Sequence, residues 1–353
     1  ARKVQAVASG VLASGDTVIV NANGTVSVVA GANAGAGTPA TVDSTSDANK
    51  DSCSVYDAAS GKVVIAYQKD GGGYSGRAIV GTISGTSISF GSVVTFTTNE
   101  VGKIAITYDS NAEKVFIAYR DKSNSSYVTG VVGTVSGTSI SFGTPAVPNS
   151  NGSSEVSVDF DSNSNKILLA YRQGNGYGIA EAITISGTSF SSGSASTFNS
   201  GNVKGIDTAF STSANRFVIV YTDSDQSNQG RYIVATISGQ NVVYGTEGDA
   251  SNVYSNYTNV AYDSGQDKFL FVYRDEDASG DPAKARVGTL SGTTVSWGSI
   301  VQFTSAPNDY LNSVYNSVDG TMFVSYADES GDKYPKFQIG TISGTSITFG
   351  GEI

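Results

Sequence analysis

One eleven-residue phrase recurs along the chain and limits the fold more than any other feature of the sequence. Residues 81–91 read GTISGTSISFG, and near-identical copies occupy residues 133–143 and 340–350. Looser copies follow the same pattern at residues 183–193, 235–245 and 288–298. The glycine at the centre of each copy recurs every 50 to 53 residues, at Gly85, Gly137, Gly187, Gly239, Gly292 and Gly344. Six copies at this spacing indicate a repeat architecture.

A second phrase in each repeat predicts a strand, a polar turn and another strand. Its clearest copy spans residues 108–119, where the apolar run is too short for an ordinary helix and is rich in β-formers. In this repeat we expect four strands, named A to D in chain order, at residues 104–108, 114–119, 128–135 and 138–142. Gly137, between strands C and D, permits the positive φ of a tight hairpin turn.

Four-stranded antiparallel units of this length, repeated six times, predict an all-β fold, a six-bladed β-propeller. A single sheet cannot bury both faces, whereas sheets packed in a ring cover each other and leave only short outer edges. The alternatives are an open solenoid or a string of separate small β domains, and the short connections between repeats argue against separate domains. The expected blades are about residues 51–99, 100–151, 152–201, 202–252, 253–306 and 307–353.

The first fifty residues stand outside the repeat. In residues 16–29, two runs rich in valine and threonine flank a polar turn that ends in Asn-Gly. This pattern predicts a β-hairpin within an N-terminal segment, residues 1–33. Residues 34–50 are expected to form a linker, because the chain around them is rich in glycine and alanine. Within this linker, residues 37–42 echo residues 143–148, which follow strand D of the second repeat. We therefore expect residues 37–42 to lie beside the sixth blade and to help close the ring.

Composition excludes several classes of function. The chain has 353 residues, a net charge of −10, no histidine and one cysteine. Without histidine there is no Ser-His-Asp or Cys-His triad and no imidazole metal ligand. One cysteine excludes a disulfide framework and a thiolate zinc site. The acidic balance argues against nucleic acid as a partner, and no apolar run approaches the length of a membrane span, so no membrane insertion is expected.

Antiparallel connectivity sends the A–B and C–D turns to one end of the sheets and the B–C loops and D–A connections to the other. The turns are short and alike, while the loops differ and carry tyrosine, asparagine, aspartate and arginine. Variable loops on a rigid scaffold are typical of recognition, although drift of solvated loops among repeats produces the same pattern. The candidate ligand-binding residues are Tyr74, Arg120, Asp121, Tyr127, Arg172, Tyr177, Asp223, Asp225, Tyr257, Arg274, Asp275, Tyr310, Asp328 and Tyr334.

A tyrosine near the end of strand B recurs in every repeat. These residues are Tyr67, Tyr119, Tyr171, Tyr221, Tyr273 and Tyr326. A row of ligand-stacking rings is one interpretation, and packing between blades with a polar tip is the one we favour. An arginine follows three of them, at Arg120, Arg172 and Arg274, for which we expect salt bridges to nearby aspartates rather than a carboxylate clamp.

Two other kinds of site, a calcium site and a catalytic site, have little support in the sequence. Asp275, Asp277 and Asp281 place oxygen ligands as a calcium loop begins, but the twelfth position counted from Asp275 is Arg286 instead of glutamate, so the EF-hand pattern fails. A solvated acidic loop is the default interpretation, and no metal or cofactor is expected, with calcium as the alternative. Catalytic carboxylate pairs cannot be placed from the sequence, and the Ser-x-Asp-x-Gly-x-Thr-Trp boxes of sialidase-type propellers are missing. We assign no catalytic residue and expect no enzyme activity.

The repeat phrases resemble those of β-propeller structural proteins, of tail-fibre or decoration type, in the virions of marine tailed bacteriophages. Residues 118–121, 131–143 and 14–26 carry the resemblance. It implies a virion protein made and assembled in the host cytoplasm, present in many copies and displayed on the particle. It also implies that residues 1–33 anchor the protein to other virion proteins, while the loops contact a host surface glycan or protein. A purely structural virion subunit and a secreted bacterial adhesin or lectin are the alternatives.

Overall fold

The computed structural model describes residues 7–8, 18–20, 25–28, 37–44, 49–70, 74–329 and 335–353. Within these ranges the chain is almost entirely β-structure, and the single helical element is η1, a 3-10 turn at Ser224–Gln226. No helix in this part of the chain is long and apolar enough to span a membrane. The chain divides into two compact units, residues 1–42 with 83–89, and residues 43–82 with 90–353.

The smaller unit contains one three-stranded sheet, formed by β1 (Val7–Ala8), β2 (Val18–Val20) and β3 (Thr25–Val28). Strands β2 and β3 are antiparallel, with Val18 opposite Val28, as the predicted hairpin requires, and β1 runs parallel to β3. The predicted turn and most of the glycine-rich stretch lie outside the described residues. The role of residues 1–33 as an anchor stays a prediction.

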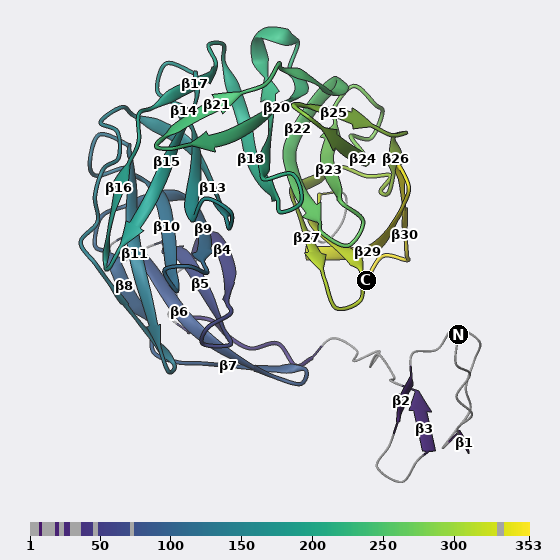
Figure 1. Cartoon of the computed structure of the whole chain (residues 1–353), viewed down its shortest axis with the longest axis horizontal. Helices are drawn as coiled ribbons and strands as arrows, with labels where there is room; N and C mark the ends of the chain where they lie inside the picture. The colour runs from purple at the N-terminus through teal and green to yellow at the C-terminus, as the bar shows by residue number, and fades with distance from the viewer. Residues whose placement is uncertain are drawn as a thin grey trace. The chain divides into compact units, whose positions relative to one another are not determined.

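The six repeats fold into six consecutive sheets of four antiparallel strands, numbered sheets 1 to 6 along the chain (Figure 1). Sheet 1 consists of β4 (Asn49–Asp57), β5 (Lys62–Lys69), β6 (Ser75–Ser84) and β7 (Ser87–Phe90). Sheet 2 consists of β9 (Val101–Asp109), β10 (Lys114–Asp121), β11 (Tyr127–Ser136) and β12 (Ser139–Phe142). Sheet 3 consists of β13 (Ser153–Asp161), β14 (Lys166–Gln173), β15 (Gly178–Ser186) and β16 (Ser189–Ser192). Sheet 4 consists of β18 (Val203–Ser211), β19 (Arg216–Asp223), β20 (Gln229–Ser238) and β21 (Asn241–Tyr244). Sheet 5 consists of β22 (Gly248–Asp263), β23 (Lys268–Asp275), β24 (Ala283–Ser291) and β25 (Thr294–Trp297). Sheet 6 consists of β27 (Asn308–Asn316), β28 (Thr321–Asp328), β29 (Pro335–Ser343) and β30 (Ser346–Phe349).

After strand D the chain folds back along strand C of the same sheet. Short return strands β8 (Val94–Thr97), β17 (Ser196–Asn199) and β26 (Val301–Gln302) make this pairing in sheets 1, 3 and 5. The long strand β22 does it for sheet 4 and then continues as strand A of sheet 5, so these two sheets are hydrogen-bonded into one. The four strands expected in the second repeat are all present, with ends that differ from the expected ones by at most three residues.

The strand-B tyrosines lie in the core between sheets, as predicted. All six are at most 2% exposed. The ring of Tyr119 lies 5.3 Å from that of Phe96, and the ring of Tyr221 lies 5.2 Å from that of Phe198. Each phenylalanine belongs to the return strand of the preceding sheet, so the tyrosine of one sheet packs on its neighbour. Burial leaves these rings no face for a ligand to stack on.

Polar side chains and glycines shape the turns of the repeat. Gly137 has φ 62°, as the hairpin between strands C and D requires. In the A–B turn of sheet 2, the buried Asp109 carboxylate accepts the N–H groups of Asn111 and Ala112 at 2.9 and 2.8 Å. Equivalent side chains start the other A–B turns, which explains why an aspartate so often ends strand A in this sequence.

Strand A carries a β-bulge near its start in every sheet. The bulged residue has positive φ in five sheets, at Asp51, Lys103, Gly205, Tyr257 and Tyr310. A bulge kinks the strand and redirects its side chain, so these residues project differently from the rest of strand A. No pattern in the sequence predicted these bulges.

Strand A of each sheet packs against strand A of the next, in the order β4, β9, β13, β18, β22 and β27 (Figure 1). Where one sheet meets the next, the glycine after strand D approaches a turn: a Cβ on Gly91 would lie 1.8 Å from the carbonyl oxygen of Thr138. Gly37 approaches Thr86 at the same 1.8 Å, although it precedes the first repeat. Gly37 thus makes the same close approach to a C–D turn as a glycine that follows strand D. Their position beside sheet 6, and closure of the ring, stay predictions.

Candidate functional site

The B–C loops and the D–A connections lie together at one end of the sheets, which we call the loop face. Backbone hydrogen bonds join the two kinds of segment: Ser224 donates its N–H to Asn202 at 2.8 Å, and Glu329 donates to Pro307 at 3.0 Å. The expected separation of the loops from the tight turns is therefore present in sheets 4 and 6. Two pockets open on this face.

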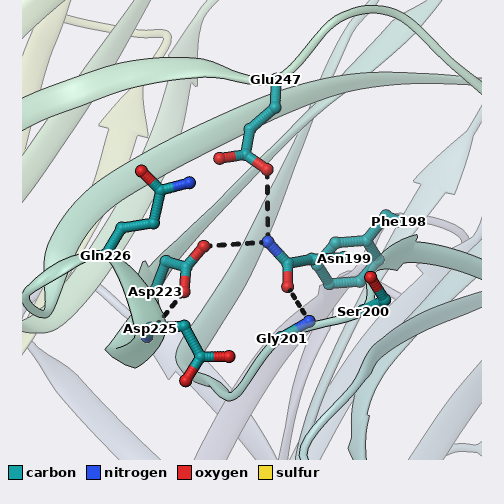
Figure 2. Close-up of a pocket in the computed structure, with 8 residues that line it drawn as sticks. All are labelled: Phe198, Asn199, Ser200, Gly201, Asp223, Asp225, Gln226 and Glu247. Atoms are coloured by element: carbon teal, nitrogen blue, oxygen red, sulfur yellow. Dashed lines mark hydrogen bonds between the residues drawn. The ribbon is translucent and has the colours of Figure 1, made fainter.

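The first pocket lies where sheet 3 meets sheet 4 (Figure 2). It has a volume of about 580 Å³, within the range of about 300–1,000 Å³ that is typical of small-molecule sites. Its lining residues are Phe198, Asn199, Ser200, Gly201, Asp223, Asp225, Gln226 and Glu247. The return strand of sheet 3, the B–C loop of sheet 4 and the segment after strand D of sheet 4 contribute them. Asp223 and Asp225, two of the predicted site residues, thus share one pocket.

Asn199 is the centre of the hydrogen-bond network in this pocket (Figure 2). Its Nδ2 donates to Oδ2 of Asp223 at 3.1 Å and to Oε2 of Glu247 at 3.2 Å, and its Oδ1 accepts the N–H of Gly201 at 2.6 Å. Asp225 accepts the N–H of Asn202 at 3.0 Å. The side chains are therefore held in place before any ligand arrives, and several carboxylate lone pairs remain available as acceptors.

Charge in the first pocket is negative and only partly balanced. Arg231 Nε lies 2.6 Å from Oε1 of Glu247 and also pairs with Asp249, so one carboxylate of the lining is neutralised. Beneath the pocket, burial first and then the charge of Glu247 raise the pKa of Tyr221. Its hydroxyl therefore stays protonated at neutral pH. It lies within electrostatic reach of Asn199 and Glu247 but makes no hydrogen bond of good geometry with any described residue.

The second pocket occupies the same place in the repeat, where sheet 5 meets sheet 6. Its volume is about 500 Å³ and its lining includes Phe303, Thr304 and Glu352, the counterparts of Phe198, Asn199 and Glu247. Glu352 accepts the hydroxyl of the strand-B tyrosine Tyr326 at 2.7 Å and pairs with Lys336 at 2.7 Å. The repeat has therefore produced a similar carboxylate-containing pocket at two of its boundaries.

Three other predicted residues meet at the bulges of sheets 5 and 6. The rings of Tyr257 and Tyr310 lie 5.6 Å apart, and the guanidinium of Arg274 lies 5.0 Å from the centroid of the Tyr257 ring. Arg274 pairs with Asp309, as the predicted salt bridge to an aspartate requires, and also with Glu276. Burial, reinforced by the charge of Asp309, raises the pKa of Tyr257 to about 12.

The other two arginines bond to neutral groups. Arg120 donates to the hydroxyl of Ser126 at 2.9 Å. Arg172 donates to Ser154 and to Oδ1 of Asn202, both at 2.8 Å. The prediction that all three arginines form salt bridges to aspartate was therefore wrong for these two, because hydroxyl and amide acceptors of the loops lie nearer.

The buried aspartates at the ends of strand B accept hydrogen bonds from the backbone of the turn that follows. Asp121 accepts the N–H groups of Ser123 and Asn124, both at 3.1 Å. Asp275 accepts the N–H of Asp277 at 3.0 Å and pairs with Lys284 at 2.5 Å. At the same place in sheet 6, Asp328 pairs with Lys336 at 2.6 Å.

The calcium alternative centred on the loop after strand B of sheet 5. Asp277 accepts the N–H of Tyr254 at 2.8 Å, and Asp281 has φ 43°. Across the described ranges, no group of three or more acidic or cysteine side chains is arranged to hold a metal ion. The expectation of no cofactor stays a prediction.

The remaining predicted residues are separate tyrosines. Tyr74 and Tyr177 are exposed on the loops of sheets 1 and 3, and Tyr127 is half-buried at the start of β11. Tyr334 lies outside the described residues. The structure does not bring Tyr74, Tyr127 and Tyr177 into either pocket.

Sequence reasoning missed Asn199, Glu247, Glu352 and Asp309. One signal was available for two of them: Glu247 and Glu352 each stand two residues after the glycine that ends strand D, at Gly245 and Gly350. No repeat-wide pattern marks Asn199, because its equivalents are Thr97 and Thr304 in other sheets. Only the fold shows that Asn199 and Glu247, from different sheets, both face the B–C loop of sheet 4.

Comparison with known proteins identifies the fold and no family. Neither protein-family models nor curated proteins match this sequence. The structure is similar to the BP39L lectin from Burkholderia pseudomallei, with a TM-score of 0.61 at 8% identity over 84% of this chain and 82% of the lectin. It is also similar to a protein from Lactobacillus plantarum, with a TM-score of 0.57 at 9% identity over 82% of this chain and 81% of that one.

A third similar structure is a sialidase from Trypanosoma rangeli, with a TM-score of 0.52 at 11% identity over 93% of this chain. The match covers 60% of the sialidase, so this chain corresponds to only part of that enzyme. At such low identity these likenesses speak to the fold alone. They confirm the predicted fold class, an all-β propeller built of four-stranded antiparallel sheets.

Proposed function

We propose that this protein is a non-enzymatic virion protein of a tailed bacteriophage, displayed on the particle as a tail-fibre or decoration protein, whose loop face binds a glycan of the host surface. The pair of equivalent loop-face pockets, each with a carboxylate beside a strand-B tyrosine, is the observation that carries the binding part. The likeness of the fold to a lectin supports it. The virion part rests on the resemblance of the repeat phrases to phage structural proteins.

The chemistry of the first pocket suits hydroxyl groups. Carboxylate and amide oxygens of Asp223, Asp225, Gln226 and Asn199 line an open space, and carboxylates accept hydrogen bonds from sugar hydroxyls. Phe198 supplies the one aromatic side chain of the lining. The surplus of negative charge disfavours sialylated or sulfated glycans, because like charges repel at short range. Two pockets on one chain, multiplied by many copies, would give avidity even where each site is weak.

A hydrolase is the second candidate, because Asp223 and Glu247 share a single amide partner and one similar fold belongs to a sialidase. We favour binding because the Glu247 carboxylate is already held by Arg231 at 2.6 Å and by Asn199, so it is not free to exchange a proton with a substrate. A structural role without a host ligand would leave both pockets unused.

A glycan array probed with the purified full chain tests the proposal, followed by calorimetric titration of any glycan that binds. Asp225→Asn and Glu247→Gln keep the shape of the pocket and remove its charge, so each should weaken binding by about tenfold, the loss of one charged hydrogen bond. Glu113→Gln, on an exposed A–B turn at the opposite end of the sheets, is the matched control and should bind like the wild type.

Three results would decide between the candidates. An array without any bound glycan would favour the structural role. Release of free sugar from a bound glycan would establish the hydrolase instead. For the virion part, deletion of residues 1–33 should abolish incorporation into particles, measured by immunoblot of purified virions. Unchanged incorporation would refute the anchor.

A further inference from the structure

The bulges of sheets 5 and 6 hold tyrosines in a backbone conformation that favours other residues. Tyr257 has φ 49° and Tyr310 has φ 55°, while the equivalent residues of sheets 1, 2 and 4, also at positive φ, are Asp51, Lys103 and Gly205, none of them aromatic. A bulky side chain at positive φ is unusual and disfavoured, and such strain gathers where the side chain serves a function. The pair therefore calls for a reason beyond the bulge itself.

The two rings differ in what covers them. Arg274 lies over the ring of Tyr257, and the neighbouring Tyr310 ring is inclined to it by 56°. Tyr310 is 72% exposed, the most exposed aromatic side chain among the described residues. The Tyr310 ring is thus held next to a second ring while most of its surface is open to solvent. It lies on a strand and not at the tip of a loop.

Polar side chains adjoin the Arg274–Tyr257 contact, next to this open ring. Arg274 is paired with Asp309 and Glu276, and Asn256 Nδ2 donates to Glu276 at 2.8 Å. Two carboxylates therefore surround one guanidinium, and the positive charge of Lys204 also acts on Glu276, so the charges of this cluster nearly balance. The pairing also fixes both carboxylates, so their free lone pairs point in defined directions.

We propose that Tyr310 is a stacking platform for the apolar face of a neutral hexopyranose, whose hydroxyls the Asp309 and Glu276 carboxylates accept. This site is separate from the two pockets, and it rests on the proposed glycan-binding function. A tyrosine ring offers a rigid apolar surface with a polar edge, which suits a sugar that is apolar on one face and polar at its rim. Because Arg274 is already shared by two carboxylates, it has little capacity left to bind the carboxylate of an acidic sugar. A quaternary ammonium group would need several converging rings, and Arg274 already occupies the face of Tyr257.

Saturation-transfer NMR with the full chain provides the test, using methyl glycosides of glucose, galactose, mannose and N-acetylglucosamine as probes, with sialyllactose and tetramethylammonium for comparison. We expect at least one neutral glycoside to receive saturation and the other two probes to receive none. Tyr310→Ala should weaken that binding by about tenfold or more, equal to about 1.4 kcal/mol. Tyr310→Trp should retain it. Tyr56→Ala is the matched control. It removes a 57% exposed tyrosine near the C-terminal end of strand A in sheet 1, far along the strand from the bulge.

Tyr310→Gly separates loss of the ring from loss of the fold, because glycine adopts positive φ without strain. This variant should keep the wild-type Tm and lose the binding. If Tyr310→Ala and Tyr56→Ala bind alike, or if only sialyllactose or tetramethylammonium binds, the platform is refuted. Binding that Asp225→Asn abolishes and Tyr310→Ala leaves intact would refute the platform while upholding the proposed function of the pockets.

Discussion

Two carboxyl groups on neighbouring A strands should make the stability of this protein fall as the pH rises. Asp159 in sheet 3 accepts the N–H of Phe160 at 2.8 Å and that of Phe210, in sheet 4, at 2.6 Å. Desolvation raises the pKa of Asp159 to about 7 in spite of these hydrogen bonds, and the nearby charge of Asp207 adds to it. Desolvation likewise raises the pKa of Asp207 to about 6.

The sign follows from where each carboxyl holds its proton. Both folded-state pKa values lie above the value of 3.8 for a free aspartate, so the folded state retains protons that the unfolded state has lost. The contribution to stability is complete below about pH 4 and disappears as the pH rises through about 6 to 7. For Asp159 the full shift corresponds to about 4 kcal/mol. Since the side chain keeps some contact with solvent, we expect about half of that, roughly 2 kcal/mol.

Urea denaturation of the wild type, Asp159→Asn and Asp207→Asn at pH 4.5, 6 and 7.5, followed by circular dichroism, measures this effect. Asparagine keeps the shape and carries no titrating proton. The free energy of unfolding of the wild type, relative to Asp159→Asn, should therefore fall by about 2 kcal/mol between pH 4.5 and pH 7.5. Asp207→Asn should show a smaller change over a lower pH range. Parallel curves for all three proteins would refute the reasoning, because they would mean that neither carboxyl holds its proton in the folded state.

Two further predictions concern the core between sheets. Tyr171 donates its hydroxyl to Glu181 at 2.7 Å in a buried site, so Tyr171→Phe should cost about 1–3 kcal/mol in chemical denaturation by stranding that carboxylate. The Tyr273 hydroxyl has no hydrogen-bond partner in the described chain, so Tyr273→Phe should be neutral or slightly stabilising, and equal losses would contradict this distinction. A Cβ on Gly143 would lie 1.8 Å from the carbonyl oxygen of Thr188 in the next sheet, so Gly143→Ala should lower stability by about 1–3 kcal/mol, and an unchanged Tm would show that the sheets do not meet there.

The candidate site was only partly predictable. Asp223 and Asp225 are two residues apart in an oxygen-rich loop, so a local pattern was enough to select them. Asn199 lies 24 residues before Asp223 and Glu247 lies 22 residues after Asp225, and nothing in the sequence states their distance in space. Arg120 and Arg172 show the opposite error, because the sequence placed aspartates near them while the folded loops present hydroxyl and amide acceptors instead.

The amino-acid sequence alone determined the repeating unit, its four strands and the tight turns, because alternation, aspartate in the A–B turns and glycine at positive φ act over a few residues. It also determined which end of the sheets is variable, since antiparallel order follows from short connections. Tertiary structure alone decided how sheets meet, which places Glu247 against Asn199, and where the bulges turn Tyr257 and Tyr310. Those features depend on contacts between residues about fifty positions apart, and a local pattern carries no record of them.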